Sequence, residues 1–487
     1  MSRTRTDFRL TYVVLCAGVS AFSLLQSMVN PVLPTIQAAL ETDQRTVTWL
    51  LTAYLLSASV FTPIVGRVGD KVGKERMLVA ALAALAVGSL IAAVAPTIEV
   101  MILARVVQGI GGGVLPLTFG IIRDEFPSEK VAGAIGTAAA LLAVGGAVGL
   151  VVAGPLVAAL NYHWLFWLPM GLTTVAGLAA WLFVPPSPVR TEGRIDLRAA
   201  VLLSSWLVCL LLPVSQGRDW GWTSPLTVGL LASAVLLCAL WVRTELRSDA
   251  PLIDMRMMRL PAVWTTNLVS LLFGVGMYAG FAFIPQFLQT PERAGYGFGA
   301  TVTASGLLLL PQSLATFTAG LLSGRLAARY GSKRLLVVGA ALAAVSQLGL
   351  AVVHEQVWQV LAATVVGGTA FGLAFAAMSN LVVEAVPRSQ TGVASGMNAN
   401  IRTVGGAIGG AVLGSVVTAG ARADGLPVEA GYTHGFAVLA TCSAVAALVA
   451  LLVPVARAPE SEELEGEVRH PELAVVASGT LLSRTGR

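Results

Sequence analysis

The chain has 487 residues, of which 56% are hydrophobic and only 12% are charged. Soluble proteins carry about 25% charged residues, and a soluble chain of this length would divide into domains joined by polar linkers, which this sequence lacks. The composition therefore excludes a soluble multidomain protein and indicates a polytopic membrane protein.

Apolar stretches of about 20 residues, the length that crosses a bilayer, follow one another along the chain. We expect an all-α polytopic membrane protein with 14 transmembrane helices. The first stretch follows three arginines, as in a signal peptide, but it has no small-residue cleavage site, so we expect it to remain as a helix. The predicted helices cover 10–29, 47–66, 77–95, 99–121, 134–156, 164–184, 197–214, 225–243, 263–288, 301–323, 335–353, 357–384, 398–420 and 433–456.

The net charge of +5 would also suit a nucleic-acid-binding protein, so the position of the basic residues matters. An even number of spans places both termini on one side, and segments assigned to that side hold 26 of the 31 Lys and Arg residues, Arg402 among them. Four lie on the other side, and Arg105 lies inside a helix. The positive-inside rule then predicts that both termini are cytoplasmic. The basic residues reflect topology, and we expect no nucleic-acid partner.

Two basic segments, 66–76 and 324–334, lie 258 residues apart and between apolar stretches, which is typical of short cytoplasmic loops between membrane helices. Residues 145–149 likewise recur at 405–409, 260 residues on. The chain is therefore predicted to be a duplicated bundle, and such bundles usually move solutes by rocking one half against the other. The identical pairs in the basic segments are Gly66 and Gly324, Arg67 and Arg325, Gly73 and Gly331, and Arg76 and Arg334.

Two of the predicted helices, 197–214 and 225–243, have no counterpart in the repeat. The expected arrangement is therefore six helices, two inserted helices and six more. The predicted domains are an N-terminal six-helix bundle (1–190), two inserted transmembrane helices (191–258), a C-terminal six-helix bundle (259–456) and a Glu-rich, disordered cytoplasmic tail (457–487).

Three sequence motifs occur in the same order as in a known family of membrane proteins, which supports the predicted bundle of membrane helices. Residues 66–76 resemble the signature between helices 2 and 3 of the major facilitator superfamily, and residues 105–111 resemble its helix-4 signature. Residues 49–54, Trp-Leu-Leu-Thr-Ala-Tyr, are similar to the helix-2 opening of its fourteen-helix drug:proton antiporter branch. The resemblance covers the chain to about residue 456 and implies the major facilitator fold in a 6+2+6 arrangement.

The sequence departs from that branch at two places. The helix-5 antiporter motif reads Gly-x-x-x-Gly-Pro-x-x-Gly-Gly, whereas here Leu150 replaces the Pro and Ala153 replaces the penultimate Gly, with Pro155 following. Leu25 stands where the branch usually has an Asp in helix 1. These departures bear on transport direction and proton coupling rather than on the fold.

Arg105 is the sharpest candidate site, because a guanidinium within a membrane span costs about 2.5–3.5 kcal/mol on insertion scales and persists only beside a cavity or a partner. Its expected partners are neutral oxygens, from Gln26 or Asn30 of the first helix or from backbone carbonyls. The alternative is that Arg105 merely ties the fourth helix to the first. The residues predicted for transport and coupling are Arg105, Gln108 and Asp124.

No carboxylate is expected deep in a helix, since Glu245 and Glu384 fall at cytoplasmic ends. A proton carrier needs a group that changes charge in the working pH range, and we assign none. Coupling through Arg105 with Asp124 or another acid at the membrane edge, coupling through protonation of the substrate, and another driving force all stay open.

The resemblance also implies a cytoplasmic gate. Asp70 would lie against the N-terminal end of a helix in the other half, starting at about residue 398, and Lys74 would pair with Asp124. The second copy has Ala328 in place of Asp70, so this contact is expected on one side only. The alternative is that these basic segments only fix the orientation of the helices in the membrane, and this alternative fits the second copy better. The predicted gate residues are Arg67, Asp70, Lys74, Arg76, Arg325, Arg334 and Glu384.

A substrate cavity is expected among sparse polar and aromatic residues on apolar walls, which suit amphipathic solutes. Its predicted residues are Gln26, Asn30, Tyr54, Asn267, Tyr278, Gln286, Gln312 and Asn380. Small residues let helices approach closely, so a hinge seam between the halves is predicted at Gly145, Gly149, Gly154, Pro155, Gly405 and Gly409.

The sequence therefore predicts a secondary active transporter that exports drug-like or antibiotic-like amphipathic compounds by alternating access, with proton antiport implied by the resemblance. An importer or facilitator of a dedicated metabolite is the alternative, and a membrane enzyme or a substrate sensor is a different class. Expected partners are a small-molecule substrate, protons and the lipid bilayer, with the protein a monomer in a bacterial cytoplasmic membrane. We expect no cofactor and no metal. We also expect no ATP site, because the glycines at 109–113 have neither a preceding strand nor a following Gly-Lys-Ser/Thr.

Overall fold

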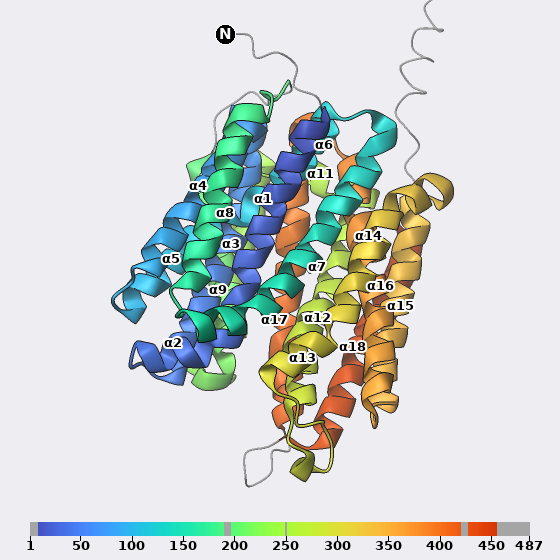
Figure 1. Cartoon of the computed structure of the whole chain (residues 1–487). Coiled ribbons are helices and arrows are strands. Elements are labelled where there is room, and N and C mark those ends of the chain that lie inside the picture. Colours follow the sequence, from blue (N-terminus) through green and yellow to red (C-terminus); the bar gives the residue numbers. More distant parts are fainter. Residues whose placement is uncertain (1–7, 189–195, 249–250, 420–426, 455–487) are drawn as a thin grey trace, which may run out of the picture. The chain divides into compact units, whose positions relative to one another are not determined.

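The computed structural model describes residues 8–188, 196–248, 251–419 and 427–454. Within these ranges the regular structure is entirely helical, and 14 helical segments are long and apolar enough to cross a membrane. Figure 1 shows them running alongside one another. The predicted all-α class and number of spans are confirmed. The predicted tail at 457–487 lies outside the described residues.

Eighteen α-helices make up this part of the chain. The first ten are α1 (Phe8–Met28), α2 (Leu33–Ala39), α3 (Gln44–Val72), α4 (Lys74–Ala93), α5 (Ile98–Gly109), α6 (Val114–Glu125), α7 (Ser128–Ala159), α8 (Trp164–Phe183), α9 (Leu197–Trp220) and α10 (Pro225–Arg247). The others are α11 (Met255–Met258), α12 (Pro261–Gln289), α13 (Val302–Leu308), α14 (Leu310–Tyr330), α15 (Ser332–Val352), α16 (Val357–Ala385), α17 (Thr391–Thr418) and α18 (Glu429–Leu452). Short 3-10 helices are η1 (Asn30–Val32), η2 (Ile110–Gly113), η3 (Glu292–Ala294) and η4 (Arg388–Gln390).

Short polar side chains mark where several of these helices begin. Asp43 accepts a hydrogen bond from the amide of Thr46 at the start of α3, at 2.7 Å. Asp196 and Ser224 accept in the same way at the starts of α9 and α10. Such side chains satisfy amides that have no partner within the first turn of a helix.

The basic segment 66–76, which we predicted to be a loop, is almost entirely helical. Helix α3 continues to Val72 and α4 begins at Lys74, so Gly73 alone joins them, with φ of 125°. The second copy is built in the same way, with Gly331 at φ 83° between α14 and α15. Glycine adopts positive φ without a steric penalty, which explains why a single residue is enough for the turn.

Two of the hydrophobic cores draw their residues mainly from opposite halves of the sequence. One contains Leu78 and Leu82 of α4 with residues of α1, α6, α7 and α8. The other contains Phe273 of α12 and Phe371 of α16 with residues of α14, α15 and α18. Helix α9 packs on both α3 and α17. The division of the chain at residues 190 and 258 stays a prediction, and we call 1–190 and 259–456 the first and second predicted bundles.

Glycines permit two close contacts between the predicted bundles. A Cβ added at Gly66 in α3 would meet the carbonyl of Gly392 in α17, and one added at Gly324 in α14 would meet the backbone of Gly133 in α7. Gly66 and Gly324 are 258 residues apart, and Gly133 and Gly392 are 259 apart. The sequence repeat therefore relates the α3–α17 crossing to the α7–α14 crossing.

Replacing Gly324 with Val is expected to destabilise the α7–α14 crossing, because the new side chain would overlap the backbone of Gly133. Overpacking of this kind costs about 1–3 kcal/mol. The detergent-solubilised variant should melt a few degrees below the wild type. Gly229→Val is the matched control, because a Cβ at Gly229 in α10 meets nothing within 4 Å. Equal melting temperatures for the two variants would contradict the close contact.

The predicted hinge glycines lie elsewhere than expected. Gly145 and Gly149 bring α7 against Ser23 and Ser27 of α1, within the first predicted bundle. Their counterparts Gly405 and Gly409 bring α17 against α12 within the second, and Pro155 lies inside α7. Only Gly154 faces the other predicted bundle, where an added Cβ would lie 3.8 Å from Thr303 Oγ1. The seam that we predicted from glycine spacing is therefore wrong for the first four, because spacing does not say which neighbour a helix face meets.

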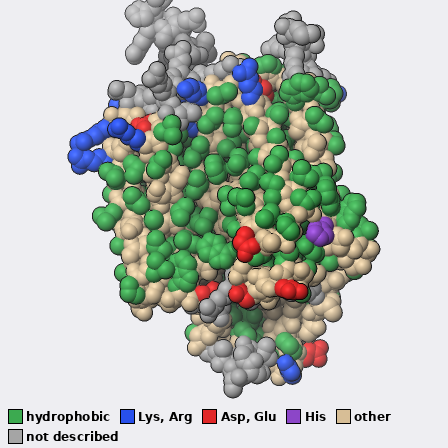
Figure 2. Space-filling view, turned by 90° about the vertical axis from the view of Figure 1, so that its left-hand side faces the viewer, with side chains coloured by type: hydrophobic (Ala, Val, Ile, Leu, Met, Phe, Trp, Pro, Cys, Tyr) green, Lys and Arg blue, Asp and Glu red, His purple; other side chains and the backbone are tan. Residues whose placement is uncertain are grey.

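The molecular surface separates apolar and charged side chains. On the face shown in Figure 2, hydrophobic side chains cover most of the middle, and most of the visible Lys and Arg side chains gather near the upper edge. Exposed apolar residues such as Leu236, Val345 and Leu448 suit contact with lipid rather than water.

Candidate functional site

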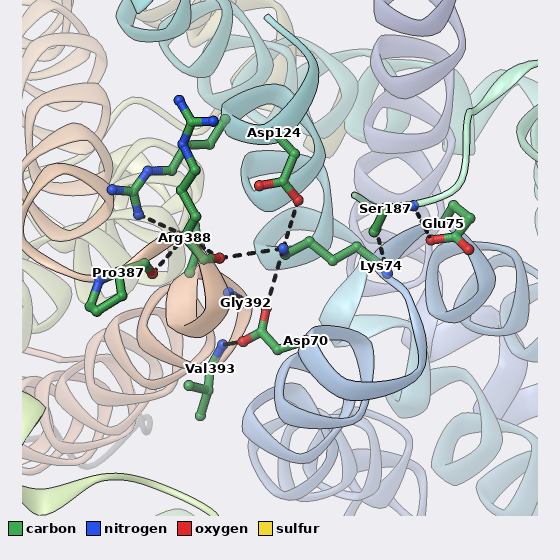
Figure 3. A network of polar contacts seen from close by, with 11 residues as sticks. Asp70, Lys74, Glu75, Asp124, Ser187, Pro387, Arg388, Gly392 and Val393 are labelled. Atoms are coloured by element: carbon green, nitrogen blue, oxygen red, sulfur yellow. Dashed lines mark hydrogen bonds and ion pairs between the residues drawn. The ribbon is translucent and has the colours of Figure 1, made fainter. Parts of the chain in front are cut away.

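Four helix ends meet around Asp70: the end of α3, the start of α4, the end of α6 and the start of α17 (Figure 3). Asp70 Oδ1 accepts a hydrogen bond from the amide of Gly392 at 3.1 Å, and Oδ2 accepts one from Val393 at 2.9 Å. These amides belong to the first turn of α17, where donors have no partner within the helix and the helix dipole favours a negative charge. The buried Asp70 carboxylate thus joins α3 to α17.

Helix α17 begins at Thr391, seven residues before the start that we predicted. Thr391, Gly392 and Ser395 lower the hydropathy of the residues before 398, which is why the sequence suggested a later start. In the fold all three are buried. The contact that Asp70 makes is therefore with residues 392 and 393 rather than with residue 398.

Lys74 lies between two carboxylates. Its Nζ is 2.7 Å from Asp124 Oδ2 and 3.6 Å from Asp70 Oδ1, and it donates to the carbonyl of Arg388 at 3.4 Å. A Cβ at Gly120 would fall 2.6 Å from Lys74 Cδ, so this glycine leaves room for the lysine stem. We call Asp70, Lys74, Asp124, Arg388, Gly392 and Val393 the Asp70 network.

Two further contacts surround this network. Ser187 accepts a hydrogen bond from the Lys74 amide at 2.9 Å and donates its own amide to Glu75 Oε2 at 3.0 Å. Arg123 of α6 donates to the hydroxyl of Thr391 at 2.8 Å. The first turn of α17 is therefore held by side chains of both α3 and α6.

The other predicted gate residues are not all brought to this place. Arg67 is buried close to Asp70. The Arg76 side chain is 65% exposed, and its Nε is 3.6 Å from Glu75 Oε1. Arg325 and Arg334 of the second copy are exposed. Glu384 is also exposed, near Arg123 and Ser332.

Arg105 is 1% exposed and is surrounded by neutral groups. Its Nε donates to the carbonyl of Leu50 at 2.9 Å, its Nη1 donates to Gln108 Oε1 at 2.7 Å, and its Cζ lies 4.5 Å from the centroid of the Tyr54 ring. Gln108 in turn donates to Ser89 of α4 at 3.1 Å. The partners of Arg105 are neutral groups, as expected, but they belong to α3 and α5 rather than α1. Gln26 is half-buried, and the side chain of Asn30 lies outside the described residues.

Replacing Arg105 is expected to lower the stability of the folded protein. Lysine retains the charge but cannot place two donors in a plane while stacking on an aromatic ring, so Arg105→Lys should restore only part of what Arg105→Gln loses. The measurement is the melting temperature of each detergent-solubilised variant. If Arg105→Lys melted like the wild type, the planar contacts with Leu50, Gln108 and Tyr54 would contribute nothing to the stability of the folded protein.

Arg105 and Asp124, whose joint action was one of the open alternatives for coupling, are far apart. They are 19 residues apart on one span, Ile98–Glu125, which corresponds to about 28 Å along a helix. Arg105 and Gln108 lie toward one end of the span, and Asp124 belongs to the Asp70 network at the other. The structure does not bring these residues into one site.

A second buried arginine, Arg402, was not predicted as a site residue from the sequence. Arg402 is only 4% exposed and lies 14 residues from the start and 16 from the end of the span Arg388–Thr418. The assignment of Arg402 to the basic cytoplasmic segments was therefore wrong. Its Nη1 donates to Asn398 Oδ1 at 3.2 Å, and its Cζ lies 4.1 Å from the centroid of the Phe375 ring. Arg402 lies inside the predicted helix 398–420, and this position was the signal in the sequence.

A small cavity of about 10 Å³ lies beside Arg402, with room for about one water molecule. Side chains of α6, α16 and α17 surround it, and none of the predicted cavity residues is among them. Its lining residues are Leu115, Pro116, Phe119, Ser379, Val382, Ser395, Asn398, Ala399 and Arg402.

The predicted cavity residues are distributed over several places. Tyr54 lies against Arg105, and Asn267 accepts a hydrogen bond from Asn398 at 2.9 Å. Tyr278 packs against Gly406, one turn beyond Arg402. The structure does not bring the other three into these groups. Gln286 is exposed and Gln312 is buried. Asn380 is also buried, and neither of its side-chain polar atoms bonds to a described residue.

Comparison with known proteins connects this geometry to a family. The model of the Major Facilitator Superfamily matches residues 15–410 and, a second time, residues 266–485. A tetracenomycin C resistance and export protein of Streptomyces glaucescens is 28% identical over 83% of this chain and 75% of its own length. The multidrug resistance protein Stp of Mycobacterium tuberculosis is 28% identical over 86% and 77%. The multidrug transporter protein MdtP of Bacillus subtilis is 26% identical over 76% and 68%.

Solved structures show the same fold at low sequence identity. The human organic anion transporter MFSD10 superposes with a TM-score of 0.68 at 16% identity, covering 91% of this chain and 99% of that one. The proton:xylose symporter XylE gives 0.67 at 12% identity, covering 92% and 96%. With a family model that matches most of the sequence and 14 spanning helices in this fold, the chain belongs to the Major Facilitator Superfamily.

Proposed function

We propose that this protein is a secondary active transporter that exports drug-like or antibiotic-like amphipathic compounds across a bacterial cytoplasmic membrane. Its curated relatives named above are resistance, export or multidrug transport proteins of bacteria, which supports export. The structural observation that supports transport most is the Asp70 network. It joins α17 to α3 and α6 through ionic and hydrogen-bonded contacts, which can break and re-form as the predicted bundles move.

The proposed mechanism is alternating access by the two predicted bundles, 1–190 and 259–456, with 191–258 as two inserted helices. The Asp70 network closes one side of the membrane in the described conformation and opens when α17 moves away from α3. We place this side in the cytoplasm, together with both termini, because the basic residues predominate there by the positive-inside rule. The unit of transport is a monomer.

We further propose proton antiport. The span Ile98–Glu125 holds Arg105 and Gln108 toward one end and Asp124 at the other, and the 3-10 helix η2 interrupts it between them. Asp124 is an ionisable group whose Oδ1 has no partner among the described residues. A proton on Asp124 would weaken its ion pair with Lys74, which would couple protonation to opening of the Asp70 network.

The test is accumulation of a panel of fluorescent cationic, neutral and anionic compounds in an efflux-deficient bacterium that expresses the chain, with and without a protonophore. Lower accumulation that the protonophore abolishes would support proton-driven export. Higher accumulation would support the alternative, an importer or facilitator. Unchanged accumulation across the whole panel would contradict multidrug export.

A further inference from the structure

Arg402 places a positive charge midway along a membrane span and beside a cavity. Its guanidinium lines the cavity between α6, α16 and α17, together with Ser395 and Asn398. Helix α6 belongs to the first predicted bundle and α16 and α17 to the second, so the cavity lies between the parts that the proposed mechanism moves. An ionisable residue at this depth indicates a functional site.

The contacts of Arg402 orient the guanidinium and leave its charge without a counter-ion. Asn398 accepts from Arg402 and donates to Asn267 Oδ1 at 2.9 Å and to Ser270 Oγ at 2.7 Å, which fixes the carboxamide. None of the ion pairs formed among the described residues involves Arg402. The hydroxyl of Ser395, buried in the wall of the same cavity, also has no partner in the described part of the chain.

Arg105 differs from Arg402 in this respect. The Arg105 guanidinium is shared between Leu50, Gln108 and the Tyr54 ring, and Arg105 does not line the cavity described above. A guanidinium recognises carboxylates through paired, planar hydrogen bonds. Arg402, with an oriented guanidinium, no anionic partner and an adjacent cavity, is therefore the better placed of the two to bind an anion.

We propose that Arg402 binds the carboxylate of the transported compound, so that amphipathic weak acids are the preferred substrates. This inference rests on the proposed function. The cavity is too small for a drug-sized molecule in the described conformation, and separation of α6 from α16 and α17 enlarges it. Helix α17 connects the two sites directly, because Arg402 lies 11 residues after Thr391, about 16 Å along the helix that Asp70 holds at its first turn.

The test compares ligands that share one ring system and differ in charge: 2-naphthoate, 2-naphthamide and 2-naphthylmethylammonium. Binding to the full-length protein in detergent is measured by calorimetry. The wild type should bind 2-naphthoate about 10- to 100-fold more tightly than 2-naphthamide, the usual range for a hydrogen bond to a charged group. Arg402→Gln should abolish that preference and Arg402→Lys should retain part of it. Arg243→Gln, at an exposed arginine of α10, should leave it unchanged.

A second variant covers the case in which Arg402→Gln fails to fold. Asn398→Asp places a carboxylate where Arg402 already donates, which supplies an internal counter-ion and should weaken 2-naphthoate binding at least tenfold while 2-naphthamide binding persists. Persistence of the carboxylate preference in either variant, or its absence in the wild type, would overturn the inference. Export of panel compounds with no carboxylate preference would overturn this inference alone, whereas no export of any compound would overturn the proposed function as well.

Discussion

The Asp70→Asn variant is expected to transport at less than a tenth of the wild-type rate at matched expression. Asparagine retains one acceptor for the amides of Gly392 and Val393 but removes the negative charge at the start of α17. Each hydrogen bond to a charged group contributes about 1.5–3 kcal/mol, so the conformation closed at the Asp70 network loses stability relative to the open one. A transporter that no longer closes this side cannot complete its cycle.

Export from cells with a fluorescent substrate of the panel measures this effect. Glu129→Gln is the matched control, because Glu129 is an exposed acid at the start of α7, the helix that the repeat relates to α17. The control should transport like the wild type. Wild-type rates for Asp70→Asn would remove the network from the transport mechanism and leave it a structural anchor.

Lys74→Met is expected to be the most destabilising single substitution in the network. It leaves the buried carboxylates of Asp70 and Asp124 without the ammonium that lies between them. Breaking a buried ion pair from one side costs about 3–5 kcal/mol, because the remaining charge stays buried and uncompensated. Poor expression and a markedly lower melting temperature should follow.

The double variant Lys74→Met/Asp124→Asn should recover part of this loss, because it removes one of the two uncompensated charges. The melting temperatures of the two single variants and the double variant form a cycle that isolates the interaction between Lys74 and Asp124. Lys333→Met, in the first turn of α15 in the second copy, is the control and should have little effect. Strictly additive losses in the cycle would mean that the 2.7 Å contact contributes nothing.

The sequence was enough to predict the helices, because spans of about 20 apolar residues have few other solutions. It was misleading wherever a helix carries polar residues that the fold buries. The predicted start of α17 was seven residues late because Thr391, Gly392 and Ser395 are weakly apolar, although α17 is continuous through all three and the fold buries them. Periodicity and hydropathy treat such residues as exposed, and only their partners in other helices show otherwise.

Only part of the candidate site could be predicted from the sequence, for the same reason. The grouping of Asp70, Lys74 and Asp124 followed from resemblance to a family motif. The environment of Arg402 did not, because it depends on Asn267 and Ser270 of α12, more than a hundred residues earlier in the sequence. The glycines of α7 and α17 show a similar limit, since their spacing predicted close packing correctly but not the helix against which each of them packs.

The two glycine crossings, α3–α17 and α7–α14, have the same backbone approach but not the same chemistry. Only the first has a carboxylate on the amides of the facing helix, because Ala328 occupies the place of Asp70 in the second. In the proposed alternating-access cycle, separation at α3–α17 requires these charged groups to exchange protein partners for water, and the described residues form no such carboxylate contact at α7–α14. We therefore expect a change of charge at Asp70 to alter the rate of the proposed opening step without altering the helix packing that both crossings share.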